Sequence, residues 1–142
     1  TVHFTHYVIA HAHIGMYAFV TMVLFGSIYY VLPRILDWEW SSKKLIKAHF
    51  WLTAIGIIIY IMALQYGGIF QGIMMNNADT PFIEIVEYTI PFLQARSFAA
   101  VLLTTGHLIF AYLVFKMVFV RKAERPDPIT EIGKSQTHAE AR

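Results

Sequence analysis

The sequence predicts an all-α membrane protein with three transmembrane helices. Of its 142 residues, 57% are hydrophobic and 14% are charged, whereas a soluble domain usually carries about 25% charged residues. Three stretches contain no Asp, Glu, Lys or Arg, namely residues 7–32, 48–78 and 97–115. About 20 consecutive apolar residues are enough to cross the hydrocarbon core of a bilayer, so each stretch predicts one span.

The first span is expected to run from about Thr5 to Leu32 and to stop at Pro33. A secretory signal peptide is a poor interpretation of this stretch, because the stretch is too long and no basic residue precedes it. The loop that follows contains Trp38 and Trp40, and tryptophan is typical of the membrane–water interface.

The second span is expected to begin near Ser42, whose hydroxyl suits a helix N-cap. Gly67 and Gly68 predict an interruption of this helix, either a kink or a change of packing. Residues 76–80, "NNADT", predict a turn.

Residues 81–96 predict a short helix at the outer surface, with Pro81 at its start and Pro91 bending it. The third span is then expected from about Ser97 to Val120. We therefore divide the chain into a transmembrane segment, residues 1–123, and a polar tail, residues 124–142, that is expected to be mostly disordered.

Charge predicts the orientation of the three spans. Basic residues gather in the first connection and after the third span: Arg34, Lys43, Lys44, Lys47, Lys116, Arg121, Lys122 and Arg125. The second connection has Arg96 as its single basic residue. By the positive-inside rule, the first connection and the C-terminus are cytoplasmic, and the N-terminus lies outside. The absence of cysteine excludes disulfides, iron–sulfur ligation by this chain and covalent c-type heme attachment.

Two of the histidines in the first span, His11 and His13, lie two residues apart. Residues i and i+2 of an α-helix point about 200° apart, so these side chains face opposite sides. Two histidines that chelate one metal ion from a helix are instead spaced i, i+4. The spacing therefore suits two separate partners, and heme is a natural one because it fits between helices and takes imidazole as an axial ligand.

The small neighbours of the two histidines are compatible with heme on both sides. Gly15 shares the His11 face and Ala10 shares the His13 face, so each leaves room for a flat macrocycle. The other interpretation is ordinary helix packing, with each histidine hydrogen-bonded to a neighbouring helix and small residues at the contact. Ionisable residues inside membrane segments are functional candidates by default.

The segment "HFTHYVIAHAHIGMY" resembles the tenth helix of subunit I of the heme–copper oxidases, most closely the cbb3-type cytochrome c oxidases. Three later segments are similar to the last two helices and loops of the same subunit: "GSIYYVLPRILDWEW", "AHFWLTAIGIIIYIMALQYGGIFQG" and "IPFLQARSFAAVLLTTGHLIFAY". The resemblance covers residues 2 to about 120, and it implies that the three spans are helices ten to twelve of that subunit.

The resemblance also implies roles for three histidines. His11 would be the axial ligand of the high-spin heme, and His13 an axial ligand of the low-spin heme. His3 would hydrogen-bond a propionate of the high-spin heme. The cofactors would be two b-type hemes, shared with the rest of subunit I, and a copper ion held by partner segments.

The implied activity is reduction of O2 to water in aerobic respiration, coupled to proton translocation. It would require the remaining helices of subunit I, so the chain is expected to be the C-terminal part of that subunit or one chain of a split subunit. Its partners would be those helices, the c-type cytochrome subunits and membrane lipid, with no nucleic acid. Its location would be the bacterial inner membrane, as a multi-pass protein.

The histidines without a role in the resemblance include three outside the first span: His49, His107 and His138. His49 lies near the inner end of the second span, and His138 lies in the tail. We interpret His107, about ten residues into the third span, as hydrogen-bonded to a neighbouring helix rather than as a ligand. No catalytic residue is assigned in this chain, and the copper ligands are expected outside it.

Three alternatives stay open at the level of sequence. The large subunit of a bacterial nitric oxide reductase has the same helix pair, with non-heme iron in place of copper. A small cytochrome b membrane anchor would pair His11 or His13 with His107 on one heme, and would leave one histidine without a role. A structural or assembly subunit would bind no heme.

Overall fold

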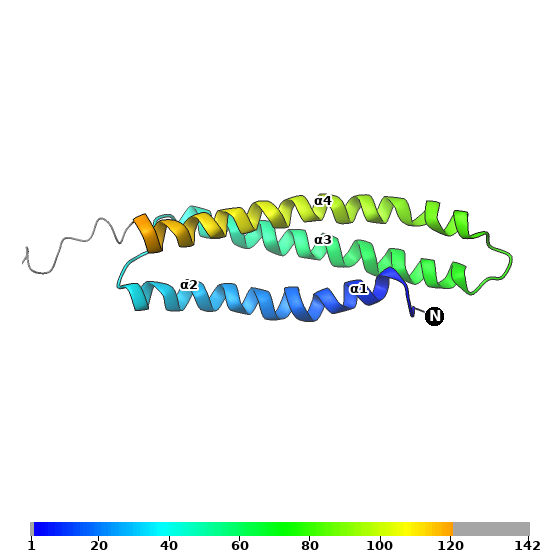
Figure 1. Ribbon diagram of the computed structural model, residues 1–142, viewed down its shortest axis with the longest axis horizontal. Coiled ribbons are helices and arrows are strands. Elements are labelled where there is room, and N and C mark those ends of the chain that lie inside the picture. The colour runs from blue at the N-terminus through cyan, green and yellow to red at the C-terminus, as the bar shows by residue number, and fades with distance from the viewer. Residues whose placement is uncertain (1, 121–142) are drawn as a thin grey trace, which may run out of the picture.

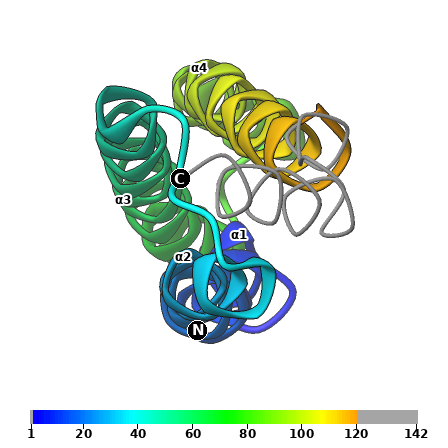
Figure 2. The same cartoon turned by 90° about the vertical axis from the view of Figure 1, so that its left-hand side faces the viewer.

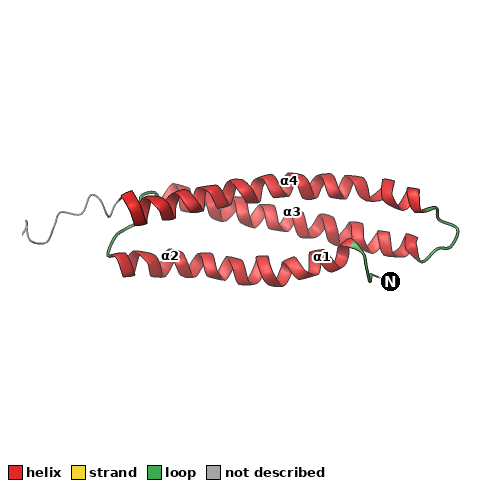
Figure 3. Cartoon of the chain, in the orientation of Figure 1, coloured by secondary structure: helices red, strands yellow, loops and turns green. Residues whose placement is uncertain are grey.

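The computed structural model describes residues 2–120, and helices are the regular elements of these residues (Figure 3). Three long helical segments lie side by side, and each runs antiparallel to the segment before it, so the first and third are parallel (Figure 1). The first consists of α1 (His6–His13), a π-helical stretch η1 (Ile14–Thr21) and α2 (Met22–Leu36). The second is α3 (Lys43–Met75), and the third is α4 (Phe82–Phe115) with a π-helical end η2 (Lys116–Val120).

All three segments are long and apolar enough to cross a membrane, with lengths of 31, 33 and 39 residues. The prediction of three apolar spans is therefore confirmed for the described residues. The start of α1 and the turn between α3 and α4 lie at one end, and the turn between α2 and α3 lies at the other (Figure 1). The tail, residues 124–142, lies outside the described residues.

The packed core lies mainly between α3 and α4. Viewed along the bundle, α3 borders both α4 and the first segment (Figure 2). The buried apolar side chains are Ala10, Ile57, Ile61, Leu64, Ile85, Ala99, Leu113 and Met117. Large apolar side chains on the remaining faces are exposed, for example Phe98 at 59% and Leu108 at 66%. Such faces suit lipid or further helices rather than water.

The first helix continues past Pro33 and ends at Leu36, so the prediction that it stops at Pro33 is wrong. Proline has no N–H and leaves the carbonyl four residues earlier without its helical donor. That carbonyl belongs to Tyr29, and the indole N–H of Trp40 donates to it at 2.9 Å. Because the loop supplies the missing donor, the helix continues until Asp37 turns into a left-handed conformation (φ 54°).

The second helix begins after Ser42, whose hydroxyl accepts a hydrogen bond from the N–H of Leu45, as predicted. The helix is not interrupted at Gly67 and Gly68. These glycines instead mark a change of packing partner: a Cβ at Gly67 would lie 2.8 Å from the ring of Phe92 on α4, and one at Gly68 would clash with the backbone N of Tyr7 on α1. Gly68 therefore lets α1 approach α3 closely.

The prediction of a separate outer helix before the third span is wrong. Helix α4 is continuous from Phe82 to Phe115, with Pro81 at its N-cap and Pro91 inside it. A proline in a membrane helix removes one backbone hydrogen bond, which the rest of a long helix tolerates. Residues 76–80 form the predicted turn, with Thr80 N–H bonded to the carbonyl of Asn77 at 3.2 Å.

Candidate functional site

Helix α1 positions the two candidate ligands. Thr5 caps its N-terminus and accepts a hydrogen bond from the N–H of Tyr7. The helix is α-helical through His13, so His11 and His13 leave it about 200° apart. Their surroundings differ accordingly.

His13 is half-buried and faces α3. Its ring centroid lies 4.7 Å from that of Tyr60. Its Nδ1 is 2.7 Å from the carbonyl oxygen of Ile9, one turn earlier. Because a carbonyl can only accept, this contact places the proton of a neutral His13 on Nδ1 and leaves the lone pair on Nε2. A ring fixed in this way is typical of metal-ligating histidine.

His11 is exposed, and its imidazole makes no hydrogen bond to any residue from 2 to 120. Its ring is stacked beside that of Tyr7, one turn earlier, at 6.4 Å between centroids. At Gly15, on the same face, an added Cβ would meet nothing within 4 Å. The described part of the chain therefore leaves open space on the His11 side of the helix.

The sequence led us to expect that Ala10 leaves room for a macrocycle beside His13, and this expectation is wrong. Ala10 is completely buried, because α1 packs closely on α3 at this level. On this face the ring of Tyr60 lies next to His13, at 4.7 Å between the ring centroids.

A π-helical stretch follows the histidine pair directly, which sequence reasoning missed. In η1 the hydroxyl of Thr21 donates to the carbonyl of Met16, five residues earlier, at 2.8 Å. Single π-helical stretches inside α-helices occur frequently at functional sites. No feature of the residues from Ile14 to Thr21 distinguishes them from ordinary apolar helix, so the sequence carries no signal for it.

His3 lies before α1, in an exposed turn. Its ring lies 4.8 Å from that of Phe4, whose φ of 61° turns the chain sharply. His6, to which no role was assigned, is tied to α3: its backbone N–H and its Nδ1 lie 3.0 and 2.6 Å from Oε1 of Gln71. The turn is therefore anchored to α3 next to His3.

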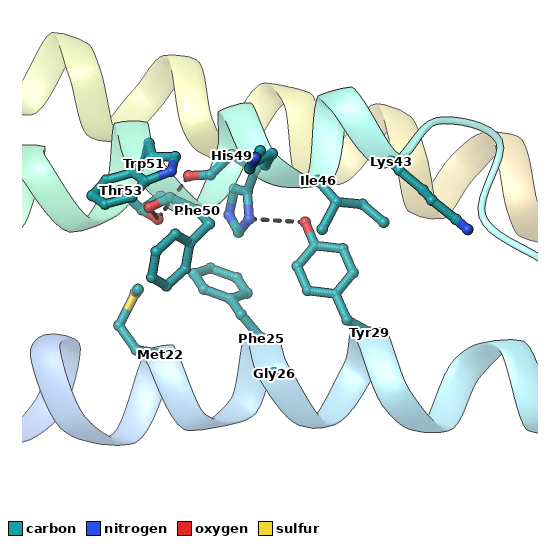
Figure 4. A pocket seen from close by; sticks show the side chains of 11 residues that line it. Met22, Phe25, Gly26, Tyr29, Lys43, Ile46, His49, Phe50, Trp51 and Thr53 are labelled. Carbon is teal, nitrogen blue, oxygen red and sulfur yellow. Dashed lines mark hydrogen bonds between the residues drawn. The ribbon is translucent and has the colours of Figure 1, made fainter.

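The other two described histidines form a second group, further along the bundle. His107 Nε2 lies 3.0 Å from the hydroxyl of Tyr17 in η1, which confirms that His107 is hydrogen-bonded to a neighbouring helix. His49 is 1% exposed, and its Nδ1 lies 2.8 Å from the hydroxyl of Tyr29 on α2 (Figure 4). The ring of Phe25 contacts both imidazoles, with centroids at 4.6 and 5.8 Å.

His138 lies outside the described residues. Within residues 2–120, no group of three or more His, Cys, Asp or Glu side chains is arranged to hold a metal ion. The candidate site of the described chain therefore consists of single imidazoles, each of which would need further ligands from elsewhere to complete a metal centre.

Comparison with known proteins identifies the family. Residues 1–102 match the family model of cytochrome C and quinol oxidase polypeptide I. A cytochrome c oxidase subunit 1 homolog (bacteroid) of Bradyrhizobium diazoefficiens is 36% identical in an alignment 138 residues long that covers 89% of this chain and 24% of the relative. The cbb3-type cytochrome c oxidase subunit CcoN1 of Stutzerimonas stutzeri is 32% identical, over 92% of this chain and 29% of the relative.

A cytochrome c oxidase subunit 1 from Thermus thermophilus is 27% identical over 142 residues. The chain spans about a quarter of the length of these curated relatives. The family match covers more than half of the chain, and it includes both histidines of the pair. The chain belongs to the cytochrome c and quinol oxidase polypeptide I family.

Proposed function

We propose that this chain is part of the catalytic subunit of a cbb3-type cytochrome c oxidase, in which His11 is the axial ligand of the high-spin heme and His13 of the low-spin heme. When bound, the two b-type hemes supply electron transfer and the iron at which O2 is reduced to water. Copper would be held by the remaining segments of the subunit. The names of the relatives support an oxidase rather than a nitric oxide reductase.

The observation that carries this proposal is the orientation of His13. Its Nδ1 is bound to the carbonyl of Ile9 at 2.7 Å, and its Nε2 is left as the free lone pair. Contrast His107, whose Nε2 already lies 3.0 Å from the hydroxyl of Tyr17. An anchor-type cytochrome b that used His107 as its second ligand would have to break this contact first.

The surroundings of His11 also fit a heme ligand. The imidazole is exposed and unbonded within the described chain, and the space at Gly15 is open. Because a helix is about 10 Å across, groups bound to His11 and His13 would lie on opposite sides of one helix and close to each other. His11 would hold one side of its iron and leave the other side for the copper site.

His3 would act on the same heme from the outer surface. It lies eight residues before His11 in an exposed turn, where its imidazole could donate a hydrogen bond to a propionate. The anchoring of His6 to Gln71 would hold this turn against α3.

The charge distribution supports the proposed orientation. The end that carries Lys43, Lys44 and Lys47 would face the cytoplasm of a bacterial inner membrane, together with the tail. The end with the N-terminus and the turn between α3 and α4 would face outward (Figure 1). Electrons would then enter from c-type cytochrome subunits, and oxygen reduction would be coupled to proton translocation.

The test compares three single replacements in the assembled oxidase complex. His13→Ala should abolish the low-spin optical signal and keep some CO-binding heme, whereas His11→Ala should abolish CO binding and keep the low-spin signal. His6→Ala is the matched control on the same helix: it removes an imidazole that is not a proposed ligand, so both signals should remain, although the turn before α1 loses its side-chain contact with Gln71. If both hemes survive in His11→Ala and in His13→Ala, the proposed ligation is wrong.

A further inference from the structure

A cavity of about 700 Å³ lies between α2 and α3, at the end of the bundle where these two helices are connected (Figure 4). Its volume falls within the range of small-molecule sites. Its lining is mostly apolar and aromatic: Met22, Phe25, Gly26, Tyr29, Lys43, Ile46, Lys47, His49, Phe50, Trp51 and Thr53. The proposed heme ligands are not among these residues.

The polar groups in the wall determine what the cavity could bind. The Tyr29 hydroxyl and His49 Nδ1 form a hydrogen bond with each other, at 2.8 Å. The Thr53 hydroxyl donates to the carbonyls of His49 and Phe50, at 2.8 and 3.0 Å. The Nε2 of His49 has no hydrogen-bond partner among the described residues, but it is buried and therefore not accessible to a ligand in the cavity. The wall thus offers few accessible polar groups to a neutral hydrogen-bonding headgroup such as a quinone.

Three wall residues keep unused donors. The ammonium groups of Lys43 and Lys47 are exposed, and neither forms an ion pair with a carboxylate in the described chain. The Trp51 side chain is 55% exposed, and its indole N–H has no partner among residues 2–120. Lys43, Lys47 and Trp51 are spaced four residues apart, so they follow one face of α3 at intervals of about 6 Å.

We propose that this cavity binds an anionic glycerophospholipid of the cytoplasmic leaflet. Lys43 and Lys47 would hold the phosphate and headgroup, and the indole N–H of Trp51, one turn deeper, would donate to an ester carbonyl. Basic pockets between transmembrane helices on the cytoplasmic side are suited to anionic headgroups. The proposal rests on the proposed orientation, in which the Lys43 end faces the cytoplasm.

The acyl chain would lie against α2. At Gly26 an added Cβ would meet nothing within 4 Å, so this position is an open part of the cavity wall. The side chains of Phe25, from α2, and Phe50, from α3, both point into the space between the helices (Figure 4). A chain seated there would cover apolar surface that the described residues leave exposed.

A second groove provides an internal comparison. A cavity of about 250 Å³ also involves α2, and its lining is Leu24, Ser27, Ile28, Val31, Leu32 and Ile35. It contains no lysine and no tryptophan. We expect ordinary, exchangeable lipid there, without preference for charge.

The test uses the assembled complex, purified in detergent after growth in its native membrane, with bound phospholipid measured by mass spectrometry. The unmodified complex should retain phosphatidylglycerol or cardiolipin in preference to phosphatidylethanolamine. Lys43→Gln combined with Lys47→Gln should lower retention of the anionic lipid about tenfold or more, since each lysine near the surface contributes separately. Gly26→Leu should lower it by filling the cavity.

Two controls make the result specific. Lys44→Gln removes the same charge from the neighbouring position, which does not line the cavity, and Ser27→Leu fills the second groove. Both should keep the anionic lipid. Equal retention in the double lysine variant and the Lys44 variant would overturn the proposal. So would absence of retained lipid from the unmodified complex, the result expected if another helix fills the cavity.

The optical spectra of the same variants separate this proposal from the proposed heme ligation. We expect the spectra of all four variants to be unchanged, because no proposed heme ligand lines the cavity. A loss of lipid with intact heme signals supports the lipid site on its own. Intact lipid binding in a complex without the predicted heme signals would contradict the proposed ligation and leave the lipid site supported.

Discussion

Two groups of histidines in this bundle, His11 with His13 and His49 with His107, differ in the hydrogen-bond partners of their ring nitrogens. Near the N-terminal end, His13 has one nitrogen fixed by a carbonyl of its own helix, and His11 has both nitrogens unbonded within the described chain. Further along, His49 and His107 each meet a tyrosine hydroxyl from the first segment, at 2.8 and 3.0 Å.

This difference separates a structural histidine from a candidate ligand. All four lie in apolar segments, where any ionisable residue is a functional candidate. A histidine that is paired with a tyrosine of the neighbouring helix joins two helices. A histidine such as His13, whose Nε2 has no partner and whose side chain is not fully buried, can serve a group that the described chain does not contain. The Nε2 of His49 also has no partner, but His49 is 1% exposed, so no such group reaches it.

The largest expected effect on the heme signals comes from a substitution that forces α1 away from α3. Gly68→Leu would place a side chain where the backbone of Tyr7 lies, so α1 could not keep its position. We expect loss of both heme signals from the assembled complex, measured by reduced-minus-oxidised spectra. Gly26→Ala, at a position with open space, should keep both signals, and normal hemes in Gly68→Leu would refute the close contact.

A smaller effect is expected from filling the space on the His11 side. Gly15→Leu meets no described atom within 4 Å of its Cβ, so this chain alone predicts no clash. If a high-spin heme occupies that space, the variant should bind CO several-fold less and keep its low-spin signal. Undiminished CO binding would show that the space at Gly15 is not used by heme.

Changes at the second histidine group, His49 and His107, should alter the thermal stability of the complex rather than its heme signals. Tyr29→Phe removes the hydroxyl that His49 meets and leaves both of its buried ring nitrogens without a partner. An unsatisfied buried group costs about 1–3 kcal/mol, so the complex should denature at lower temperature with unchanged heme spectra. Tyr30→Phe is the matched control, because Tyr30 is 62% exposed. Equal thermal midpoints for the two variants would contradict a structural role for the pair.

The smallest effect is expected at Trp40. Trp40→Phe removes the N–H that donates to the carbonyl of Tyr29 at 2.9 Å. A single hydrogen bond contributes about 1 kcal/mol net, so the thermal midpoint should fall slightly and the hemes should be unaffected. A fall as large as that of Tyr29→Phe would mean that Trp40 does more than replace the donor missing at Pro33.

The sequence predicted the spans well, because hydropathy alone determines which segments can cross a bilayer. It predicted their ends poorly at Pro33 and Pro91. Proline lowers the probability of a helix in general, but a distant donor such as Trp40, or the length of the helix itself, compensates for it in this bundle. Sequence spacing carries no information about either compensation.

The same limit applies to the site. The spacing of His11 and His13 is local, so their opposite directions could be predicted from the helix repeat. The partners that distinguish the histidines are remote in sequence: Tyr60 for His13, and Tyr17 for His107. They become visible only once the helices are packed.

The central claim is that His11 and His13 ligate two different irons from opposite sides of one helix. An experimentally determined structure of the assembled complex, with its hemes bound, tests this claim most directly. We predict that Nε2 of His13 coordinates one heme iron, that His11 coordinates a second, and that His13 Nδ1 keeps its contact with the carbonyl of Ile9. Both imidazoles on a single metal, or either one without iron, would contradict the account.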